Sequence, residues 1–383
     1  EDVDQFFVPY AFATNAEIKN TTLSSLLVTN KKADWELSAP ILEDQHVWMT
    51  STHSTASYAY FENTKAFTFD SITELAIQNF DSSIAAFKEN LITSFKSNTS
   101  DALTNEQAVV SYVAAMAQNG KYQRALDDIP SGFRHSKQRT FLSAPFFNSL
   151  SDMNNTLEAE ISRRNEVIKN AGSTGSFQAF TEKNMAAFMY IYPNTATVRR
   201  LMENAGNATP ENLSLAECAG ILRVYIEMYP LSKALAAHLE PVLPACIEKL
   251  EKSCKMEGDN LTISENGTFL SVLQAIEVGD ALIRYGELVG NQNLVQSGKF
   301  LVSSYMAESS SFDFRTLGEI YPILVHNNNY YPHFKKIYTQ DNDVVWAWTV
   351  ANDITYEKDS SGNITYFIDF PEGSTHYVIF RGV

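Results

Sequence analysis

The spacing of hydrophobic residues divides this chain into three parts. In residues 1–70, short runs rich in aromatic and β-branched residues predict strands, as in HVWMTSTHSTASYAYF at 46–61. From 71 to 338 hydrophobic residues recur at intervals of three and four, which predicts amphipathic helices. From 344 to 383 the pattern again predicts strands, with a hairpin turn at DSSGN. The sequence therefore predicts a mainly α protein with β ends, in the α+β class.

The four tryptophans bear on how the two ends relate. Trp35 and Trp48 fall in the first strand-rich part and Trp346 and Trp348 in the last, with none in the helical middle. Short isolated hairpins are only marginally stable, so each end needs a partner. We therefore expect the C-terminal β segment, incomplete by itself, to pack with the N-terminal region.

The helical middle reads as antiparallel helix pairs with short breaks. The clearest pair is FLSVLQAIEVGDALIRYGELVGNQNLVQSGKFLVSSYM at 269–306, with its turn at Gly290. Glycine is unfavourable inside a helix, so Gly279, Gly286 and Gly298 indicate that two backbones approach closely. This hairpin resembles those that build the α/α toroid domains of glycoside hydrolases and polysaccharide lyases. The resemblance implies a toroid of inner and outer helices and activity on carbohydrates.

Two other segments suggest a location. FLSAPFFNSLSDMNNTLEAEI at 141–161 and IDFPEGSTHYVIFRGV at 368–383 are similar to stretches of uncharacterised secreted or lipoprotein-type proteins of spirochaetes. This resemblance implies a periplasmic, cell-surface or secreted protein whose signal peptide has been removed. It also implies that the chain continues past Val383. It carries no catalytic residue.

Charge and motif content exclude several functions. The formal net charge of −16 disfavours nucleic acid as a partner, because phosphates need clustered Lys and Arg. No apolar run approaches the roughly 20 residues of a transmembrane helix. The chain has no phosphate-binding loop, dinucleotide fingerprint, zinc-protease motif or nucleophile elbow. His46 and His53 would face opposite sides of one strand, so we predict no metal site, and no cofactor is indicated.

Three helical segments place acidic residues near aromatic or arginine side chains, which suits glycoside hydrolysis by two carboxylates. The candidate catalytic acids are Glu227, Asp280 and Glu319, with Glu277 and Asp313 as alternatives in the same segments. The candidate binding residues beside them are Tyr225, Tyr229, Arg284 and Arg315. The alternative interpretation is that these acids face solvent and form ordinary i,i+4 ion pairs with the arginines.

The stretch HNNNYYPH at 326–333 combines the residue types that polysaccharide lyases use for proton abstraction. Tyr330, Tyr331 and His333 are therefore candidate binding residues. Asn favours turns, however, and Pro332 excludes helical geometry at the residue before it. We predict a junction loop that borders a site, with the two tyrosines filling the junction and a new helix starting near His333.

Three functions remain open at this point. The first is a secreted or envelope-associated protein that binds a saccharide or a protein partner through its helical domain. The second is a carbohydrate-active enzyme, a glycoside hydrolase before a lyase, which requires an acidic pair in a cleft with aromatic walls. The third is a helical-repeat scaffold with a long groove. The sequence does not fix the ligand or the oligomeric state.

Overall fold

The structure is a computed structural model that divides into two compact units, Glu1–Phe67 and Thr68–Val383, described here separately. It describes the first unit by the backbone of its strands. In the second unit it describes 68–71, 80–136, 139–140, 142–143, 149–307, 309–325, 330–340, 343–371 and 377–382.

The first unit contains antiparallel strands, as its sequence pattern predicts. One sheet has the strand order β2-β3-β4-β7 and the other the order β1-β6-β5. His46 begins β6, whereas His53 lies outside the described residues. The expected packing between this unit and the C-terminal strands stays a prediction. The strands are β1 (Gln5–Phe7), β2 (Glu17–Thr21), β3 (Ser25–Thr29), β4 (Ala33–Ser38), β5 (Ile41–Glu43), β6 (His46–Thr50) and β7 (Tyr58–Glu62).

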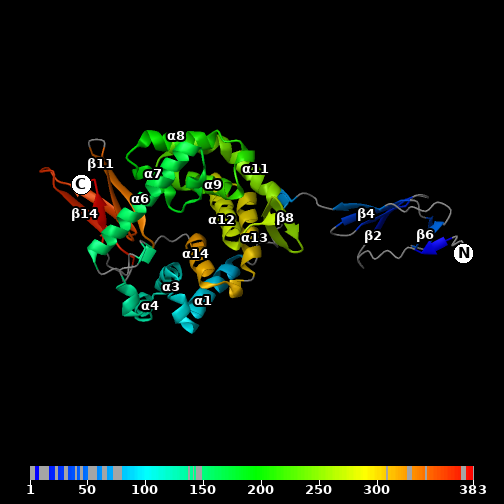
Figure 1. Cartoon of the computed structure of the whole chain (residues 1–383), viewed down its shortest axis with the longest axis horizontal. Coiled ribbons are helices and arrows are strands. Elements are labelled where there is room, and N and C mark those ends of the chain that lie inside the picture. Colours follow the sequence, from blue (N-terminus) through cyan, green and yellow to red (C-terminus); the bar gives the residue numbers. More distant parts are fainter. Residues whose placement is uncertain are drawn as a thin grey trace. The chain divides into compact units, whose positions relative to one another are not determined.

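The second unit is mainly helical with small antiparallel sheets, which confirms the predicted α+β class (Figure 1). Its longer α-helices are α1 (Phe80–Ser97), α3 (Glu106–Gln118), α6 (Leu150–Thr174), α8 (Thr195–Gly206), α9 (Leu215–Met228), α11 (Leu243–Ser253), α12 (Val272–Val289), α13 (Gln292–Met306) and α14 (Phe314–Val325). The shorter ones are α2 (Thr99–Ala102), α4 (Tyr122–Asp127), α5 (Ser131–Arg134), α7 (Met185–Ile191) and α10 (Lys233–Ala236). Five 3-10 segments are η1 (Phe69–Ser71), η4 (Gln178–Thr181), η5 (Pro210–Asn212), η6 (Ala237–Val242) and η7 (Ser309–Ser311) among the described residues.

The pair α12–α13 lies at the centre of this unit, and the predicted turn and glycine contacts are both present. Gly290 ends α12 in the left-handed conformation, with φ of 73°, and the Asn291 side chain caps α13. A Cβ at Gly298 would lie 2.4 Å from the carbonyl oxygen of Gly279, so the backbones of α12 and α13 touch there. Whether such pairs close into a toroid stays a prediction.

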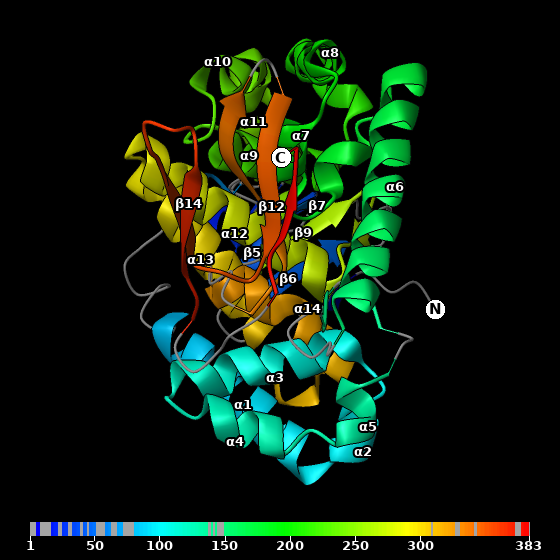
Figure 2. The ribbon, with the colours of Figure 1, turned by 90° about the vertical axis from the view of Figure 1, so that its left-hand side faces the viewer.

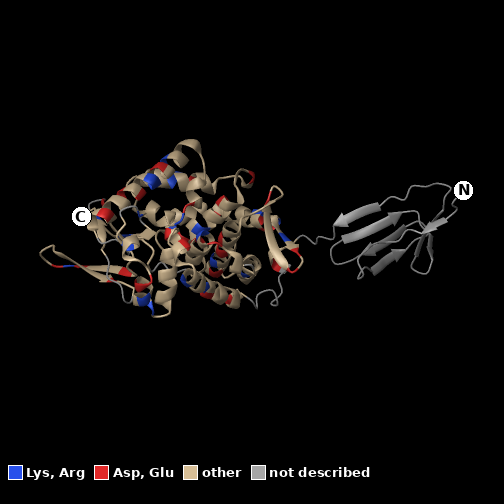
Figure 3. Ribbon diagram, turned by 60° about the horizontal axis from the view of Figure 1, so that its bottom comes forward, with Lys and Arg blue, Asp and Glu red and all other residues tan. Residues whose placement is uncertain are grey.

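The other helices pack on this pair from two sides. α14 and α3 pack together, and α1 adds to the same core. On the other side, α9 packs against α12, α11 and α7. Figure 2 shows α1, α3 and α4 grouped at one end of the unit, α8 and α10 at the other, and α6 along the side between them. Lys and Arg are interspersed with Asp and Glu along these helices (Figure 3).

Three of the C-terminal strands form a sheet on α7 and α6, and the other two, β13 and β14, form a separate hairpin. The order is β11-β12-β15, and Phe334 of β11 stacks edge-on against Trp346 of β12 and also contacts Phe188 of α7. Arg381 of β15 is bound to Glu158 of α6 at 2.7 Å. The strands are β11 (His333–Gln340), β12 (Asp343–Thr349), β13 (Asp353–Lys358), β14 (Ile364–Asp369) and β15 (Ile379–Arg381).

The hairpin predicted at DSSGN is present as β13–β14, with Gly362 at φ of 86°. Two predictions about local structure were wrong. The segment from His333 is β11 and not a helix, because its backbone pairs with β12 through seven registered residue pairs. The sequence pattern also missed the small sheet β8 (Cys254–Glu257), β9 (Asn260–Glu265) and β10 (Thr268–Phe269), although Asn266-Gly267 is a strong hairpin signal.

Candidate functional site

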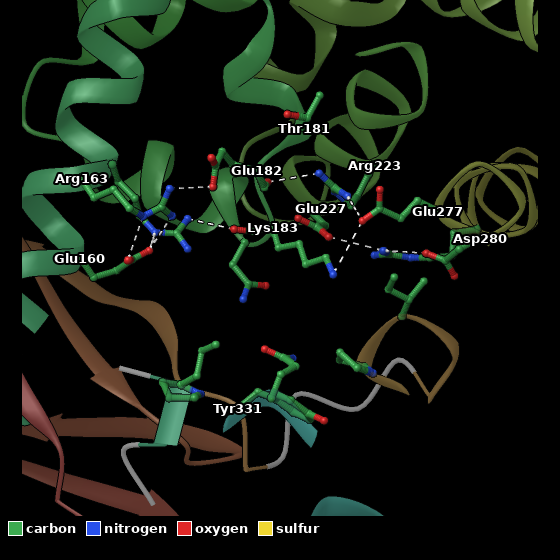
Figure 4. Close-up of a pocket in the computed structure, with 18 residues that line it drawn as sticks. Glu160, Arg163, Thr181, Glu182, Lys183, Arg223, Glu227, Glu277, Asp280 and Tyr331 are labelled. Carbon is green, nitrogen blue, oxygen red and sulfur yellow. Dashed lines mark hydrogen bonds and ion pairs between the residues drawn. The ribbon is translucent and has the colours of Figure 1, made fainter. Parts of the chain in front are cut away.

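A cavity of about 450 Å³ lies among α3, α6, α9, α12, α14 and two loops (Figure 4). Its described lining contains five basic and five acidic side chains. The basic ones are Arg163, Arg164, Lys183, Arg223 and Arg284, and the acidic ones are Glu160, Glu182, Glu227, Glu277 and Asp280. The remaining lining residues are Gln107, Leu142, Thr181, Asn184, Pro322, Ile323, Tyr331 and Pro332. Charged groups therefore dominate the lining, and their formal charges balance.

Helical spacing explains why these charges face one cavity. Residues three, four or seven apart share one face of a helix. On α9, Arg223 and Glu227 have this spacing, and on α12 Glu277 does so with Asp280 and Arg284. The opposite faces of both helices are buried in the core. Each helix therefore presents its few charged residues together.

One part of the cavity, which we call the tight end, consists of Glu160, Arg163, Arg164 and Glu182. Glu160 accepts from Arg164 at 2.6 Å and from Arg163 at 2.9 and 3.0 Å, and Arg163 reaches Glu182 at 3.0 Å. Only 3% of the Arg164 side chain is exposed, and burial lowers the pKa of its guanidinium. These are charge-assisted hydrogen bonds of normal length, so the tight end is a satisfied structural network.

The same arginine connects α6 to its neighbours. The Arg164 guanidinium lies 5.4 Å from the ring centre of Phe334 in β11, within cation–π range. It also donates to the backbone carbonyl of Lys183 at 2.9 Å. Arg164 therefore supports both the C-terminal sheet and the loop that enters the cavity.

That loop, residues 178–184, is held from a second side by α9. Arg223 donates to the carbonyls of Phe180 at 2.9 Å and Glu182 at 3.2 Å. A Cβ at Gly220 would lie 2.3 Å from the Phe180 carbonyl oxygen, so only glycine allows this approach. Arg164 of α6 and Arg223 of α9 therefore hold the loop from two sides. Lys183 projects from the loop into the cavity (Figure 4).

The second part of the cavity, which we call the loose end, has contacts of a different kind. Its members are Lys183, Arg223, Glu277, Glu227, Asp280 and Arg284. The Glu277 carboxylate lies 3.7 Å from Lys183 and 4.0 Å from Arg223. Arg284 lies 3.4 Å from Glu227 and 3.7 Å from Asp280. Nitrogen–oxygen hydrogen bonds usually measure 2.7–3.2 Å, so these charges attract one another without forming good hydrogen bonds.

Two further properties distinguish the cations Arg223 and Lys183 of the loose end. The Nε atom of Arg223 is buried and has no hydrogen-bond partner. Desolvation lowers the pKa of the Lys183 amine, although 41% of its side chain is exposed. Polar groups in this condition gain from any ligand that completes their hydrogen bonds.

The structure brings together five of the residues singled out from the sequence. The loose end contains Glu227, Glu277, Asp280 and Arg284, and Tyr331 lines the cavity wall. The Tyr331 hydroxyl is 2.8 Å from that of Ser111, and burial raises its pKa well above the usual value. Its hydroxyl is thus engaged in the core.

The other predicted site residues lie elsewhere. Glu319 pairs with exposed Arg315 at 3.0 Å, and its backbone carbonyl accepts a hydrogen bond from Lys183 at 3.4 Å. Tyr225 packs on Tyr285 and Tyr229 on the far side of α9 from Glu227. These residues are therefore outside the described lining of the cavity.

The junction at the end of HNNNYYPH borders the cavity through Tyr331 and Pro332. Residues 326–329 lie outside the described residues. Tyr330 is buried, has φ of 69° and stacks on Tyr122. His333 bonds to the Tyr331 carbonyl at 3.0 Å and lines a different hollow, beside α7. The two tyrosines fill a junction, as the sequence predicted.

Sequence reasoning missed Lys183, Arg223 and the tight end. Arg223 had a detectable signal, because it is a single charge within the apolar run GILRVYI, four residues before Glu227. Lys183 had none, since it belongs to a loop without periodicity.

Comparison with known proteins gives no relative. No protein-family model matches the chain, and no curated protein or solved structure matches it. No helix among the described residues is long and apolar enough to cross a membrane. Within the same residues, His, Cys, Asp and Glu side chains do not gather in any group of three or more that could hold a metal ion.

Proposed function

We propose that the helical unit binds a small polar ligand of zero net charge in this cavity. The observation that supports the proposal most strongly is the loose end, where largely half-buried donors and acceptors face a cavity without good mutual hydrogen bonds. A cavity of about 450 Å³ has the volume of a small-molecule site.

The balance of charge argues for a neutral ligand. Five basic and five acidic side chains line the described part of the cavity, so an ion with net charge would add an uncompensated charge to a partly buried site. Such a charge costs free energy in a medium of low dielectric constant. Neutral saccharides and zwitterions both meet this requirement, whereas polyanions do not.

Binding is tested by calorimetry and thermal unfolding with neutral oligosaccharides, zwitterionic amino acids and singly charged carboxylates. We expect binding in a neutral class, weakened at least about tenfold in Lys183→Met, which removes a donor that faces the cavity. The matched control is Arg315→Met, which removes an exposed ion pair outside the cavity and should leave binding unchanged. Absence of binding in every class, or equal loss in both variants, would refute the proposal.

A glycoside hydrolase is the second candidate, because Glu227 and Asp280 share the cavity. Both carboxylates contact the cation Arg284, at 3.4 and 3.7 Å, whereas a sugar-cleaving acid pair is expected to face its substrate across a cleft. The described lining contains one aromatic residue, Tyr331, so it lacks the aromatic walls expected of a sugar cleft. Release of reducing ends from a polysaccharide, abolished by Glu227→Gln, would establish this activity; new ultraviolet absorbance would indicate a lyase.

The location remains a proposal as well. A periplasmic, cell-surface or secreted site is supported by the resemblance of 141–161 and 368–383 to spirochaetal envelope proteins. Fractionation of cells that produce the full-length protein tests it, and a purely cytosolic distribution would contradict it. A protein partner likewise stays a prediction, to be sought by crosslinking in the envelope fraction.

A further inference from the structure

The loose end has two poles of opposite charge. At one pole the cations Lys183 and Arg223 both contact the carboxylate of Glu277. At the other, Arg284 contacts both of the acids Glu227 and Asp280. Figure 4 shows Lys183, Arg223, Glu227, Glu277 and Asp280 on the same side of the cavity, opposite Tyr331. Among the described residues, the first pole therefore carries an excess of positive charge and the second an excess of negative charge.

The positive pole is held ready to bind an anionic group. The Nη2 atom of Arg223 donates hydrogen bonds to two loop carbonyls, and these bonds fix the guanidinium. Its Nε atom is buried without a hydrogen-bond partner. The loop that carries Lys183 is anchored by Arg164 and packs on Gly220. These supports restrict both cations before any ligand arrives, which reduces the entropy lost on binding.

The negative pole suits an ammonium group. Three N–H donors of an ammonium can reach two carboxylates at once, and charge-assisted bonds of this kind are stronger than neutral ones. Glu227 and Asp280 come from different helices, α9 and α12, and converge on one arginine nitrogen. A ligand cation placed there would share the two acids with Arg284.

We propose that the ligand is a zwitterion of the amino-acid type, which is a free α-amino acid or a short peptide. Its carboxylate accepts hydrogen bonds from Lys183 and Arg223, and its ammonium donates to Glu227 and Asp280. The apolar remainder lies against the part of the lining that includes Tyr331, which faces the charged wall in Figure 4. The inference rests on the proposed binding function and narrows its ligand class.

Other ligand chemistry fits the two poles less well. A simple carboxylate satisfies the positive pole and leaves the acids facing each other across Arg284. An alkyl ammonium does the reverse. A neutral saccharide offers hydroxyl groups to both poles but compensates the charge of neither. Only a ligand with separated charges neutralises both at once.

The test is calorimetry with L-leucine, L-phenylalanine and leucyl-leucine, together with derivatives of each in which one charge is blocked. N-acetylation removes the ammonium, and amidation removes the carboxylate. We expect the zwitterion to bind at least about tenfold more tightly than either derivative. Equal binding of zwitterion and blocked forms would overturn the inference.

Each of two variants tests one pole and the ligand group that it binds. Glu227→Gln should weaken binding of the zwitterion at least about tenfold. It should not change the affinity for the N-acetyl derivative, which binds more weakly from the start. Lys183→Met should weaken binding of the zwitterion and of the N-acetyl derivative, because both keep the carboxylate. It should leave binding of the amidated derivative unchanged. Arg315→Met is the control, and circular dichroism verifies that each variant is folded. A uniform loss for all ligands in a variant would mean a structural role and would contradict the assignment of that pole.

The outcomes separate the inference from the proposed function. Binding of a neutral oligosaccharide without any amino acid or peptide would refute the zwitterion and retain the binding function. If no amino acid, peptide or saccharide binds at millimolar concentration, both the zwitterionic ligand and the proposed binding function are refuted.

Discussion

The two ends of the cavity use the same residue types for opposite purposes. At the tight end, Glu160 bonds two arginines at 2.6–3.0 Å. At the loose end, the ion pairs of Glu277, Glu227 and Asp280 measure 3.4–4.0 Å. The first network has little left to offer a ligand, whereas the second keeps donors and acceptors available. The number of charges in a cavity is therefore less informative than whether they already satisfy one another.

The largest effect is expected where the tight end is broken. Glu160→Ala leaves the buried Arg164 guanidinium without its carboxylate, and breaking a buried ion pair costs about 3 kcal/mol of unfolding free energy. The measurement is urea denaturation. Glu166→Ala on the same helix removes an exposed pair with Lys169 and should cost less than about 0.5 kcal/mol. Similar losses in both variants would remove the distinction between structural and available charges.

The next effect concerns the loop that connects the two ends. Gly220→Ala places a Cβ against the Phe180 carbonyl oxygen, so we expect a loss of about 2 kcal/mol and weaker ligand binding, because Lys183 moves. The control is Gly132→Ala in α5, where a Cβ meets nothing within 4 Å. Alanine is the better helix former, so that control should stabilise by up to about 1 kcal/mol. Denaturation of both variants tests the opposite signs.

A smaller, pH-dependent effect on stability is expected at His333, which follows the lining residues Tyr331 and Pro332. Burial lowers the pKa of His333 below its ordinary 6.5, so the unfolded chain binds a proton at a higher pH than the folded one. The contribution of the neutral His333 side chain to the unfolding free energy is fully present above pH 6.5. It is lost as the pH falls toward the lowered pKa of the folded state. His333→Gln should therefore flatten the dependence of unfolding free energy on pH between about 5 and 7. An unchanged slope would show that this imidazole is not kept neutral.

The smallest effect on stability is expected at the loose end itself. Burial disfavours the charged amine of Lys183, so Lys183→Met should leave the unfolding free energy within about 0.5 kcal/mol of the parent or raise it. The same variant should lose ligand affinity, as a functional residue that costs stability would. Thermal unfolding and calorimetry on one sample measure both. A marked destabilisation would place Lys183 with the tight end.

Comparison with the sequence interpretation separates local from long-range information. The turn at Gly290 and the hairpin around Gly362 depend on a few consecutive residues, and both predictions are confirmed. The strand from His333 was missed, because its conformation depends on pairing with β12. Of the three candidate acids, Glu227 and Asp280 reach the cavity while Glu319 stays with Arg315, a choice that no spacing on a single helix could reveal.

Local patterns in the chain were enough to predict the class of the fold, the position of its main helix pair and the helical faces on which charges gather. These properties follow from interactions between residues a few positions apart. Long-range packing is what places charged groups as distant in the chain as Glu160 and Arg284 around one cavity. It alone distinguished the contacts of about 3 Å from those near 4 Å, because such distances are set by how helices and loops pack and not by the order of the residues.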